Sequence, residues 1–446
     1  MLSEISAFVS VLFAQNVNLK TSNMFNNFSQ PRRVVITGFG CVTPIGIGRE
    51  AFWNGLQTGK SGVSRIESFD VSDSKVKIAA EIKNFEWEAE LNPKDRKHVS
   101  RTVPLALAAA REAVKDSNIN TENLTLADRQ QFGVILGTGG GGLEFTEKQY
   151  KLWFTQENTK QASIYTIPSS THGGLSSELS MVFGLHGLSH IVSTGCTSST
   201  DAIFYAAQHI ALGKQDFMLT GGVDAPIARG ILEGFNLMTV LTSDWNDAPE
   251  RASRPFSKDR SGIVLGEGAW IFVLETLESA QKRGAKIYAE ISGYGSTCDA
   301  YHRVRLEENG IEPARAMALA MSDAGVSPDR IDYVNLHGTA TQLNDRIETQ
   351  SIKNAFGAHA YDLKMSATKS QIGHPQGASG AAGIGATLLA LNENIIAPTI
   401  NLDLPDAACD LNYTPNTAQK NADVKIALCN CIGFGSKNSA LVLKKL

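Results

Sequence analysis

The chain has 446 residues, of which 42% are hydrophobic and 19% are charged, and its formal net charge is -4. This composition is typical of a globular protein of one large or two ordinary domains, and it excludes the strongly basic nucleic-acid-binding proteins. No apolar run reaches the roughly 20 residues that cross a bilayer. We therefore expect a cytoplasmic protein that binds neither membrane nor nucleic acid.

The first 30 residues come before any clear strand or helix pattern. Their apolar segment, residues 7–14, follows Glu4, and no basic residue precedes it as in a secretory signal. We expect residues 1–30 to form a weakly ordered N-terminal extension, with the globular part starting at residue 31.

The globular part alternates short apolar runs with helical patterns. In the first half, runs that end at glycine or another small residue predict strands at 34–37, 132–136, 190–193 and 217–220, and helices at 103–115 and 200–213. The second half repeats this style, with strands at 287–291, 331–335, 425–428 and 439–443, and helices at 312–324 and 376–391. The alternation predicts an α/β fold with parallel sheets, in two similar halves at residues 31–284 and 285–446.

The segment STGCTSST, residues 193–200, places a thiol at a predicted strand-to-helix junction. Thr197, Ser198 and Asp201 favour the first turn of a helix, and a helix N-terminus favours the thiolate form of a cysteine. A buried structural cysteine fits the segment equally well. This stretch by itself therefore leaves the role of Cys196 open.

Two histidines follow later in the chain, each beside small residues. His337 comes directly after a predicted strand, where the sites of parallel α/β proteins gather, and Thr339 and Thr341 could hold an extended polar ligand. His374 follows Lys369 by five residues and precedes a helix rich in glycine and alanine, whose close packing would point both side chains inward. The alternatives are a structural His337, a capping Lys369 and a surface His374.

A glycine-rich loop, GFGSKN, surrounds Phe434 near the C-terminus. A bulky aromatic residue between glycines suits a mobile gate, although a structural glycine turn is the alternative. The combination of one thiol and two histidines suits acyl transfer with carbanion chemistry, because neutral imidazoles can donate N–H groups to an enolate oxygen.

Seven segments, taken in order, resemble one family: the β-ketoacyl-acyl carrier protein synthases of the Cys-His-His elongating class. The segments are VVITGFGCVTPIG (34–46), STGCTSSTDAI (193–203), RPFSKDRSGIVLGEGA (254–269), AKIYAEISGYGSTCDAYH (285–302), NLHGTATQLND (335–345), SATKSQIGHPQGASG (366–380) and GFGSKNS (433–439). The resemblance covers residues 33–446. It implies the thiolase-like fold, a duplicated five-layered αβαβα architecture.

Carried over by motif, the resemblance implies that Cys196 is the acyl-accepting nucleophile. It implies that His337 and His374 are the paired catalytic histidines. Lys369 would order this network, and Glu348 would support it as the partner of Lys369.

The same resemblance implies how substrate is held. Thr339 and Thr341 would bind the pantetheine arm, and the N–H groups of Cys196 and Phe434 would form the oxyanion hole at the Phe434 gate. The family commonly has a second glycine where Ser436 stands, so we expect Ser436 to stiffen the gate. No metal and no redox cofactor is implied, since substrates arrive on the phosphopantetheine of acyl carrier protein.

The predicted reaction is the decarboxylative Claisen condensation of malonyl-acyl carrier protein with a Cys196-bound acyl or polyketide chain, which grows by two carbons. GCTSSTDA and HGTATQLNDRIET look closer to the catalytic subunit of type II polyketide synthases than to the fatty-acid elongating 3-oxoacyl-acyl carrier protein synthase II, which is the alternative. A non-condensing scaffold subunit is the alternative of another class, although Cys196 argues against it. A further alternative is a thiolase, in which Cys429 or Cys431 would be the second catalytic cysteine.

The resemblance also implies a dimer, with a chain-length-factor-like subunit or otherwise with a second copy. Docking of acyl carrier protein requires a positively charged surface on the enzyme. The alternative is that the basic residues considered for this role simply form a solvated helix face. The docking candidates are Lys94, Arg96, Lys97 and Arg101. Arg303 and Arg305 stand where smaller or apolar residues are expected after DAYH, and they are further candidates at the pocket mouth.

Overall fold

A computed structural model describes residues 31–155 and 159–446, so the predicted extension at residues 1–30 lies outside the described part of the chain. An 11-stranded sheet runs through the molecule in the order β11-β10-β14-β15-β9-β1-β8-β7-β5-β6, with the short β2 paired to β1. The first half of the chain supplies β1 (Val34–Thr43), β2 (Gly46–Ile47), β5 (Phe132–Gly137), β6 (Ser189–Val192), β7 (Phe217–Asp224) and β8 (Gly268–Thr276). The second half supplies β9 (Ala289–Cys298), β10 (Tyr333–Asn335), β11 (Lys364–Ser366), β14 (Ile426–Gly433) and β15 (Lys437–Lys444).

The two halves of the sheet have the same strand order. Counted along the chain, the main strands of each half lie in the order third, second, fourth, fifth, first: β6-β5-β7-β8-β1 and β11-β10-β14-β15-β9. The two first strands, β1 and β9, pair with each other and join the halves. This repeat confirms the predicted duplicated α/β architecture.

The strand directions differ from the prediction. β5 runs parallel to β6 and β7, and β10 runs parallel to β11 and β14. In contrast, β8 is antiparallel to both of its neighbours, and so is β15. The expectation of parallel sheets was therefore wrong for the middle of the structure, where β8, a fully buried strand that had not been predicted, and β15, predicted as a strand at 439–443, both reverse the direction.

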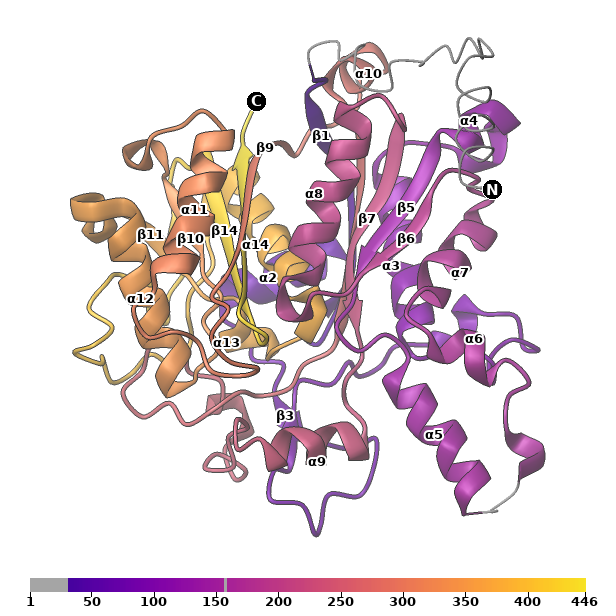
Figure 1. The fold of residues 1–446 in the computed structure, drawn as a ribbon, viewed down its shortest axis with the longest axis horizontal. Coiled ribbons are helices and arrows are strands. Elements are labelled where there is room, and N and C mark those ends of the chain that lie inside the picture. The colour runs from indigo at the N-terminus through magenta and orange to yellow at the C-terminus, as the bar shows by residue number, and fades with distance from the viewer. Residues whose placement is uncertain (1–30, 156–158) are drawn as a thin grey trace, which may run out of the picture.

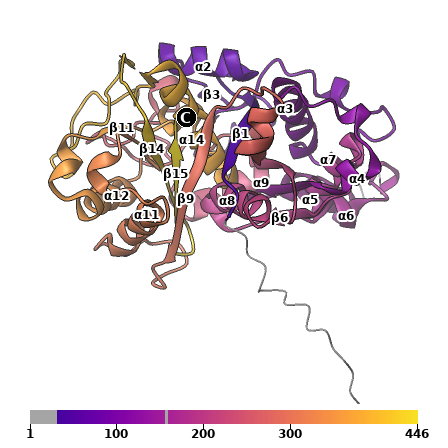
Figure 2. The same cartoon turned by 90° about the horizontal axis from the view of Figure 1, so that it is seen from above.

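Helices separate and cover the two halves of the sheet (Figures 1 and 2). Between the halves lie α8 (Ser198–Ala211) and α14 (Ser379–Glu393), which contact each other and strands of both halves. On the outer faces, α3 (Thr102–Asp116) packs on β1 and β8, and α11 (Ile311–Asp323) packs on β9 and β15 beside α12 (Gln342–Phe356). The result is the predicted five-layered αβαβα arrangement.

The small residues of α14 allow this central layer to form. A Cβ on Gly383 would lie 2.6 Å from Asn335 Oδ1 and 2.8 Å from Cys429 Sγ. A Cβ on Gly380 would lie 2.0 Å from Thr200 Oγ1 in α8. The predicted close packing of this helix is confirmed, and it brings the N-terminal ends of α8 and α14 together.

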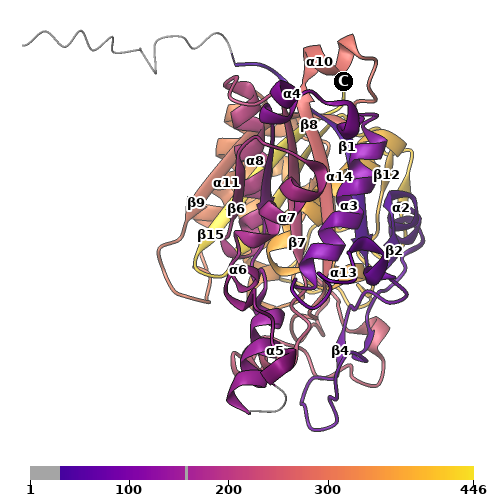
Figure 3. The ribbon, with the colours of Figure 1, turned by 90° about the vertical axis from the view of Figure 1, so that its right-hand side faces the viewer.

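The remaining elements surround this layered core. The helices are α2 (Arg49–Thr58), α4 (Leu126–Gln130), α5 (Leu143–Phe154), α6 (Thr166–Ser170), α7 (Gly174–Phe183), α9 (Arg229–Leu237), α10 (Leu277–Lys282) and α13 (Lys369–Ile372). The short strands β3 (Ser64–Arg65) and β4 (Ile78–Ala79) pair with each other, as do β12 (Ile395–Ile396) and β13 (Gln419–Lys420). Figure 3 shows α5 projecting at one end of the molecule. Within the described ranges, no helix is long and apolar enough to cross a membrane, and a cytoplasmic location stays a prediction.

Candidate active site

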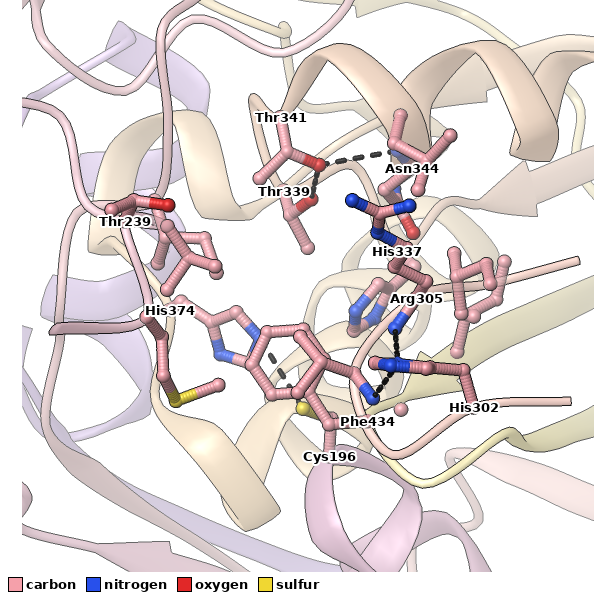
Figure 4. A pocket seen from close by; sticks show the side chains of 18 residues that line it. Cys196, Thr239, His302, Arg305, His337, Thr339, Thr341, Asn344, His374 and Phe434 are labelled. Carbon is pink, nitrogen blue, oxygen red and sulfur yellow. Dashed lines mark hydrogen bonds between the residues drawn. The ribbon is translucent and has the colours of Figure 1, made fainter. Parts of the chain in front are cut away.

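The candidate site is a cavity of about 380 Å³, and its predicted residues Cys196, His337, His374 and Phe434 come from four separate segments (Figure 4). Cys196 comes from the 3₁₀ turn η4 (Gly195–Thr197) before α8, and His337 comes from the loop after β10. His374 follows α13, and Phe434 follows β14. Side-chain atoms of Cys196, His337 and His374 all lie within 4.8 Å of one another. The fold thus brings together the three residues that the sequence predicted to act as a unit.

Cys196 lies at the N-terminal end of the central helix, as predicted. Gly195 has a φ of 76°, a left-handed conformation that favours glycine, and it turns the chain toward η4 and α8. Burial of Cys196, which is 5% exposed, raises the pKa of its thiol. The charge of Lys369 and the backbone N–H groups of Phe434 and Cys196 oppose this rise in pKa. The Lys369 charge and these N–H donors therefore offset desolvation rather than outweigh it.

His374 directs one ring nitrogen at the thiol. Its Nε2 lies 3.4 Å from Cys196 Sγ. Its Nδ1 accepts the backbone N–H of Gln376 at 3.0 Å and lies 3.3 Å from the Ser379 hydroxyl. Because a backbone N–H can only donate, Nδ1 carries no proton and the neutral ring holds its proton on Nε2. His374 is therefore arranged to donate an N–H toward the sulfur.

His337 is oriented in a similar way. Its Nδ1 lies 3.3 Å from Lys369 Nζ, an ammonium that can only donate, and 3.6 Å from Cys431 Sγ. Lys369 Nζ also donates to the carbonyl oxygen of His337 at 2.7 Å. Donation from the Lys369 ammonium to Nδ1 favours a proton on Nε2. The His337 and His374 rings stand nearly perpendicular, with centroids 5.4 Å apart.

Both imidazoles are held in the neutral form. Burial lowers the pKa of His337 and of His374 well below the ordinary value, and the Lys369 charge lowers both pKa values further. Two neutral rings with Nε2–H groups beside one thiol form a pair of hydrogen-bond donors. Such a pair of neutral N–H donors is what stabilising an enolate oxygen requires.

Glu348 supports this loop through the backbone. Its fully buried carboxylate accepts the N–H of His337 at 2.7 Å and that of Gly338 at 2.8 Å, and it also accepts from the Asn430 side chain at 2.7 Å. Burial raises its pKa to about 7. Among the ion pairs of the described residues, none joins Glu348 to Lys369. The structure therefore gives Glu348 a supporting position, but not as the direct partner of Lys369.

The predicted arm-binding threonines lie on the wall of the cavity. Thr339 Oγ1 and Thr341 Oγ1 are 3.1 Å apart, and Thr341 caps α12 by accepting the N–H of Asn344 at 3.2 Å. The buried carboxylate of Asp345 accepts the N–H of Thr339 at 3.1 Å. A left-handed Ala340, with φ of 63°, lies between the two threonines. This turn presents both hydroxyls on one side of the pocket (Figure 4).

The Phe434 loop is fastened to a neighbouring segment. The Ser436 hydroxyl donates to the carbonyl of His302 at 2.9 Å, although Ser436 has a left-handed φ of 64°. The Gly435 N–H donates to the Arg303 carbonyl at 2.9 Å, and the Asp299 N–H donates to the Ser436 carbonyl at 2.8 Å. These bonds tie the loop at 433–436 to residues 299–303.

Comparison with known proteins decides the family. Residues 31–280 match the family described as the beta-ketoacyl synthase N-terminal domain, and residues 288–403 match its C-terminal domain. The chain belongs to the beta-ketoacyl synthase family. It is therefore a condensing enzyme of the acyltransferase type, and the predicted family, fold class and enzyme class are confirmed.

Similar proteins carry two kinds of name. The 3-oxoacyl-[acyl-carrier-protein] synthase 2 of Staphylococcus aureus (strain N315) is 40% identical over 417 residues, which cover 94% of this chain and 99% of that protein. The solved ishigamide ketosynthase/chain length factor is 34% identical with a TM-score of 0.86, covering 93% of this chain and 100% of that chain. A solved type II polyketide synthase acyl carrier protein in complex with its ketosynthase bound to the hexaketide is 31% identical with a TM-score of 0.84, covering 94% and 100%. Both functional interpretations of the sequence thus have relatives.

The four docking candidates of this beta-ketoacyl synthase lie outside the cavity wall. Residues 93–98 form turns rather than a helix, and Lys94 and Lys97 are exposed. Arg96 is half-buried and donates to the Glu88 carbonyl at 2.7 Å. Arg101 makes a two-point ion pair with the buried carboxylate of Glu267, at 2.7 and 2.8 Å. The charge of Arg101 is therefore already used within the fold.

The sequence analysis missed two groups at the site. Asp224, at the end of β7, accepts the N–H groups of Gly139, Gly140 and Gly377 at 2.6–2.9 Å, and so fixes the chain just after His374. The sequence feature that could have indicated Asp224 is an acidic residue at the end of the apolar segment 217–224. Cys431, considered only as a thiolase alternative, donates its thiol to the Cys196 carbonyl at 3.0 Å.

Proposed function

We propose that this chain performs the decarboxylative condensation of malonyl-acyl carrier protein with an acyl or polyketide chain held on Cys196. The observation that carries the proposal is the pair of neutral histidines, each with its Nδ1 held by donors and its Nε2–H available at the thiol. The repeated strand order supports the division of this site between residues 31–284, which carry the nucleophile, and residues 285–446, which carry the histidines.

The first step loads the chain onto the enzyme. The Cys196 sulfur attacks the thioester carbonyl of the acyl carrier protein substrate, and a new C–S bond forms. The old C–S bond breaks, and the pantetheine sulfur leaves with the proton that the thiol gave up. The backbone N–H groups of Cys196 and Phe434 stabilise the negative oxygen of the tetrahedral intermediate, each donor contributing about 3 kcal/mol to lowering the barrier.

The second step makes the carbon nucleophile. The malonyl thioester oxygen accepts the Nε2–H groups of His337 and His374. When CO2 leaves, the electron pair of the broken C–C bond is delocalised onto this oxygen as an enolate, which two neutral donors stabilise without transferring a proton. The α-carbon then attacks the Cys196 acyl carbon, a C–C bond forms, and the Cys196 thiolate is released.

The substrate is proposed to arrive on a phosphopantetheine arm, with Thr339 and Thr341 as hydrogen-bonding partners for its amides. The carbanion arises by loss of CO2, so the proposed reaction calls for no metal or redox cofactor. Lys369 keeps both imidazoles neutral, and Phe434 gates the acyl side of the pocket.

We assign the chain to type II polyketide assembly, with 3-oxoacyl-acyl carrier protein synthase II activity in fatty-acid elongation as the second candidate. The two solved ketosynthases favour the first assignment, and the 40% identical Staphylococcus aureus protein favours the second. Product analysis separates the two: repeated condensation without ketone reduction gives a poly-β-ketone, whereas a fatty-acid enzyme condenses once per reduction cycle. A scaffold role would leave Cys196 unacylated.

A carrier protein is proposed to dock near Lys94 and Lys97, whose ammonium groups are exposed. Arg96 contributes less because it is half-buried, and Arg101 is removed from the docking set because Glu267 neutralises it. An acidic helix of the carrier protein would meet the two lysines through screened surface electrostatics.

A second subunit is proposed to cover the face that includes α5, α6, α7 and the edge strand β6 (Figure 3). Phe154, Ile167 and Met181 on these helices are 81%, 65% and 66% exposed. Apolar exposure beside an open sheet edge is typical of an interface. A chain-length-factor-like partner is our first choice and a second copy is the other. Molar-mass measurement with and without a co-expressed homologue distinguishes them.

The experiment that tests the function combines mass spectrometry with a Cys196→Gln variant. Incubation with acyl-acyl carrier protein should acylate Cys196, and Cys196→Gln should lose condensation while malonyl decarboxylation persists or increases. The glutamine amide mimics the acyl-enzyme carbonyl, so the histidines keep their geometry. Condensation by Cys196→Gln, or a wild-type enzyme that condenses with Cys196 unmodified, would refute the assignment.

A further inference from the structure

A short segment between β9 and α11 crosses one side of the pocket. Its residues His302, Val304, Arg305 and Leu306 line the cavity. Among the described residues that form the lining, Arg305 alone carries a permanent charge, and no aspartate, glutamate or lysine belongs to it. The mouth of an otherwise neutral pocket therefore contains a single cation.

The guanidinium of Arg305 has no neutralising partner in the part of the chain that the structure describes. The acidic residues nearest along the chain are Glu307 and Glu308, and Glu308 pairs with Arg346 at 2.7 Å. Within residues 31–155 and 159–446, no carboxylate forms an ion pair with Arg305. A cation that lines a cavity without an acidic partner is available to an anionic group of a ligand.

The backbone beneath Arg305 is fixed. Its N–H donates to His302 Nδ1 at 3.1 Å, and the Val304 N–H donates to the same nitrogen at 3.0 Å. His302 is in turn bound by the Ser436 hydroxyl through its carbonyl. Figure 4 shows Arg305 on the same side of the pocket as Thr339, with its side chain directed toward that wall. An anion bound there would lie beside the proposed track of the arm.

The proposed substrate carries two anionic groups, the malonyl carboxylate and the phosphodiester of the arm. The carboxylate has to lie near His337 and His374, which are only 2% and 3% exposed, whereas Arg305 is an exposed residue at the mouth. A salt bridge to the carboxylate would also stabilise the ground state and oppose CO2 loss. A phosphodiester keeps its charge throughout the reaction and suits the fork of a guanidinium.

We propose that Arg305 binds the phosphodiester of the carrier protein's prosthetic arm and so selects phosphorylated arms over bare pantetheine thioesters. The proposal rests on the proposed function. It makes Arg305 a residue that determines substrate recognition and takes no part in bond making or breaking.

The test compares two substrates that differ only in the phosphate: acyl-phosphopantetheine and acyl-pantetheine with the same acyl group. Acylation of Cys196 is followed by mass spectrometry in the wild type, in Arg305→Gln and in Arg305→Lys. The wild type should use the phosphorylated substrate about ten-fold more efficiently, since a hydrogen bond to a charged group contributes about 1.5 kcal/mol or more. Arg305→Gln should lose this preference while keeping its rate with acyl-pantetheine, and Arg305→Lys should keep part of it.

Arg303→Gln is the matched control, because Arg303 is an exposed neighbour outside the cavity wall and its recorded contact is made by its backbone carbonyl. This variant should retain the wild-type preference. Equal efficiencies of the two substrates in the wild type would overturn the proposal, as would a preference that survives in Arg305→Gln. An Arg305→Gln defect seen only with malonyl substrates, and equal with and without phosphate, would assign the cation to the carboxylate instead. Failure of Cys196 to be acylated by either substrate would count against the proposed function itself.

Discussion

Replacing Lys369 by methionine tests the electrostatic design of the site. Lys369→Met keeps the length of a buried side chain but removes its charge and the Nζ donors to the His337 carbonyl and to His337 Nδ1, at 2.7 and 3.3 Å. The Cys431 thiol, 3.6 Å from this Nδ1, cannot replace the lost donor, because its hydrogen is donated to the Cys196 carbonyl. The neutral tautomer with its proton on Nδ1 then becomes accessible, and that tautomer offers no donor to the enolate.

The expected loss follows from this change. A hydrogen bond from a charged donor contributes about 1.5–3 kcal/mol, and removal of one preorganised donor to a developing oxyanion slows enzymes by about 10²–10³. We expect malonyl decarboxylation by Lys369→Met to fall by about 100-fold.

The same variant changes the reactivity of the nucleophile in a defined direction. The Lys369 charge lowers the pKa of the Cys196 thiol, so its removal raises that pKa and leaves less thiolate at any given pH. The rate of Cys196 alkylation by iodoacetamide, followed on its own peptide by mass spectrometry, should therefore begin to rise at a higher pH than in the wild type. Lys369→Arg, which keeps the charge, should follow the wild-type profile. An unchanged alkylation profile in Lys369→Met, with the protein folded by circular dichroism, would show that the charge does not act on Cys196.

Three further substitutions, at His374 and Ser436, separate the roles of these two residues. His374→Ala should impair malonyl decarboxylation more than acylation of Cys196, because the Nε2–H is used mainly to hold the enolate oxygen; equal loss of both rates would make His374 structural. Ser436→Ala should cost about 1 kcal/mol of stability by removing the bond to the His302 carbonyl, and it should speed alkylation of Cys196 by freeing the Phe434 loop. Ser436→Gly should free the loop in the same way but relieve the left-handed φ, so its melting temperature should stay closer to the wild type. If the alkylation rate changes in neither variant, the bond from Ser436 to the His302 carbonyl does not restrain the Phe434 loop.

Much of the site could be predicted because its residues stand at element boundaries. Cys196, His337 and Phe434 each lie next to small residues that end a strand or begin a helix. Lys369 begins the short helix α13, and His374 follows it before α14. Glycine and small residues are required there by close backbone approach, as the packing of Gly380 and Gly383 illustrates. The local sequence therefore carried both the elements and the reactive groups.

Other features depend on contacts between distant segments. The direction of β8 follows from its pairing with β1 and β7, which no local pattern specifies. The family motifs suggested that Lys369 is the partner of Glu348. The fold instead brings two backbone N–H groups and the Asn430 side chain to the Glu348 carboxylate.

The sequence by itself determined the family of this protein, its duplicated α/β character and the residue types of its site, because these are recorded in motifs and in the alternation of apolar and polar residues. Only the tertiary structure decided which nitrogen of each histidine meets a donor, that Arg101 is neutralised by Glu267, and that Arg305 is the one permanent charge among the described residues that line the pocket. These properties depend on burial and on hydrogen-bond partners supplied by residues far apart in the chain. Such partners become neighbours only when the two halves of the sheet close around α8 and α14.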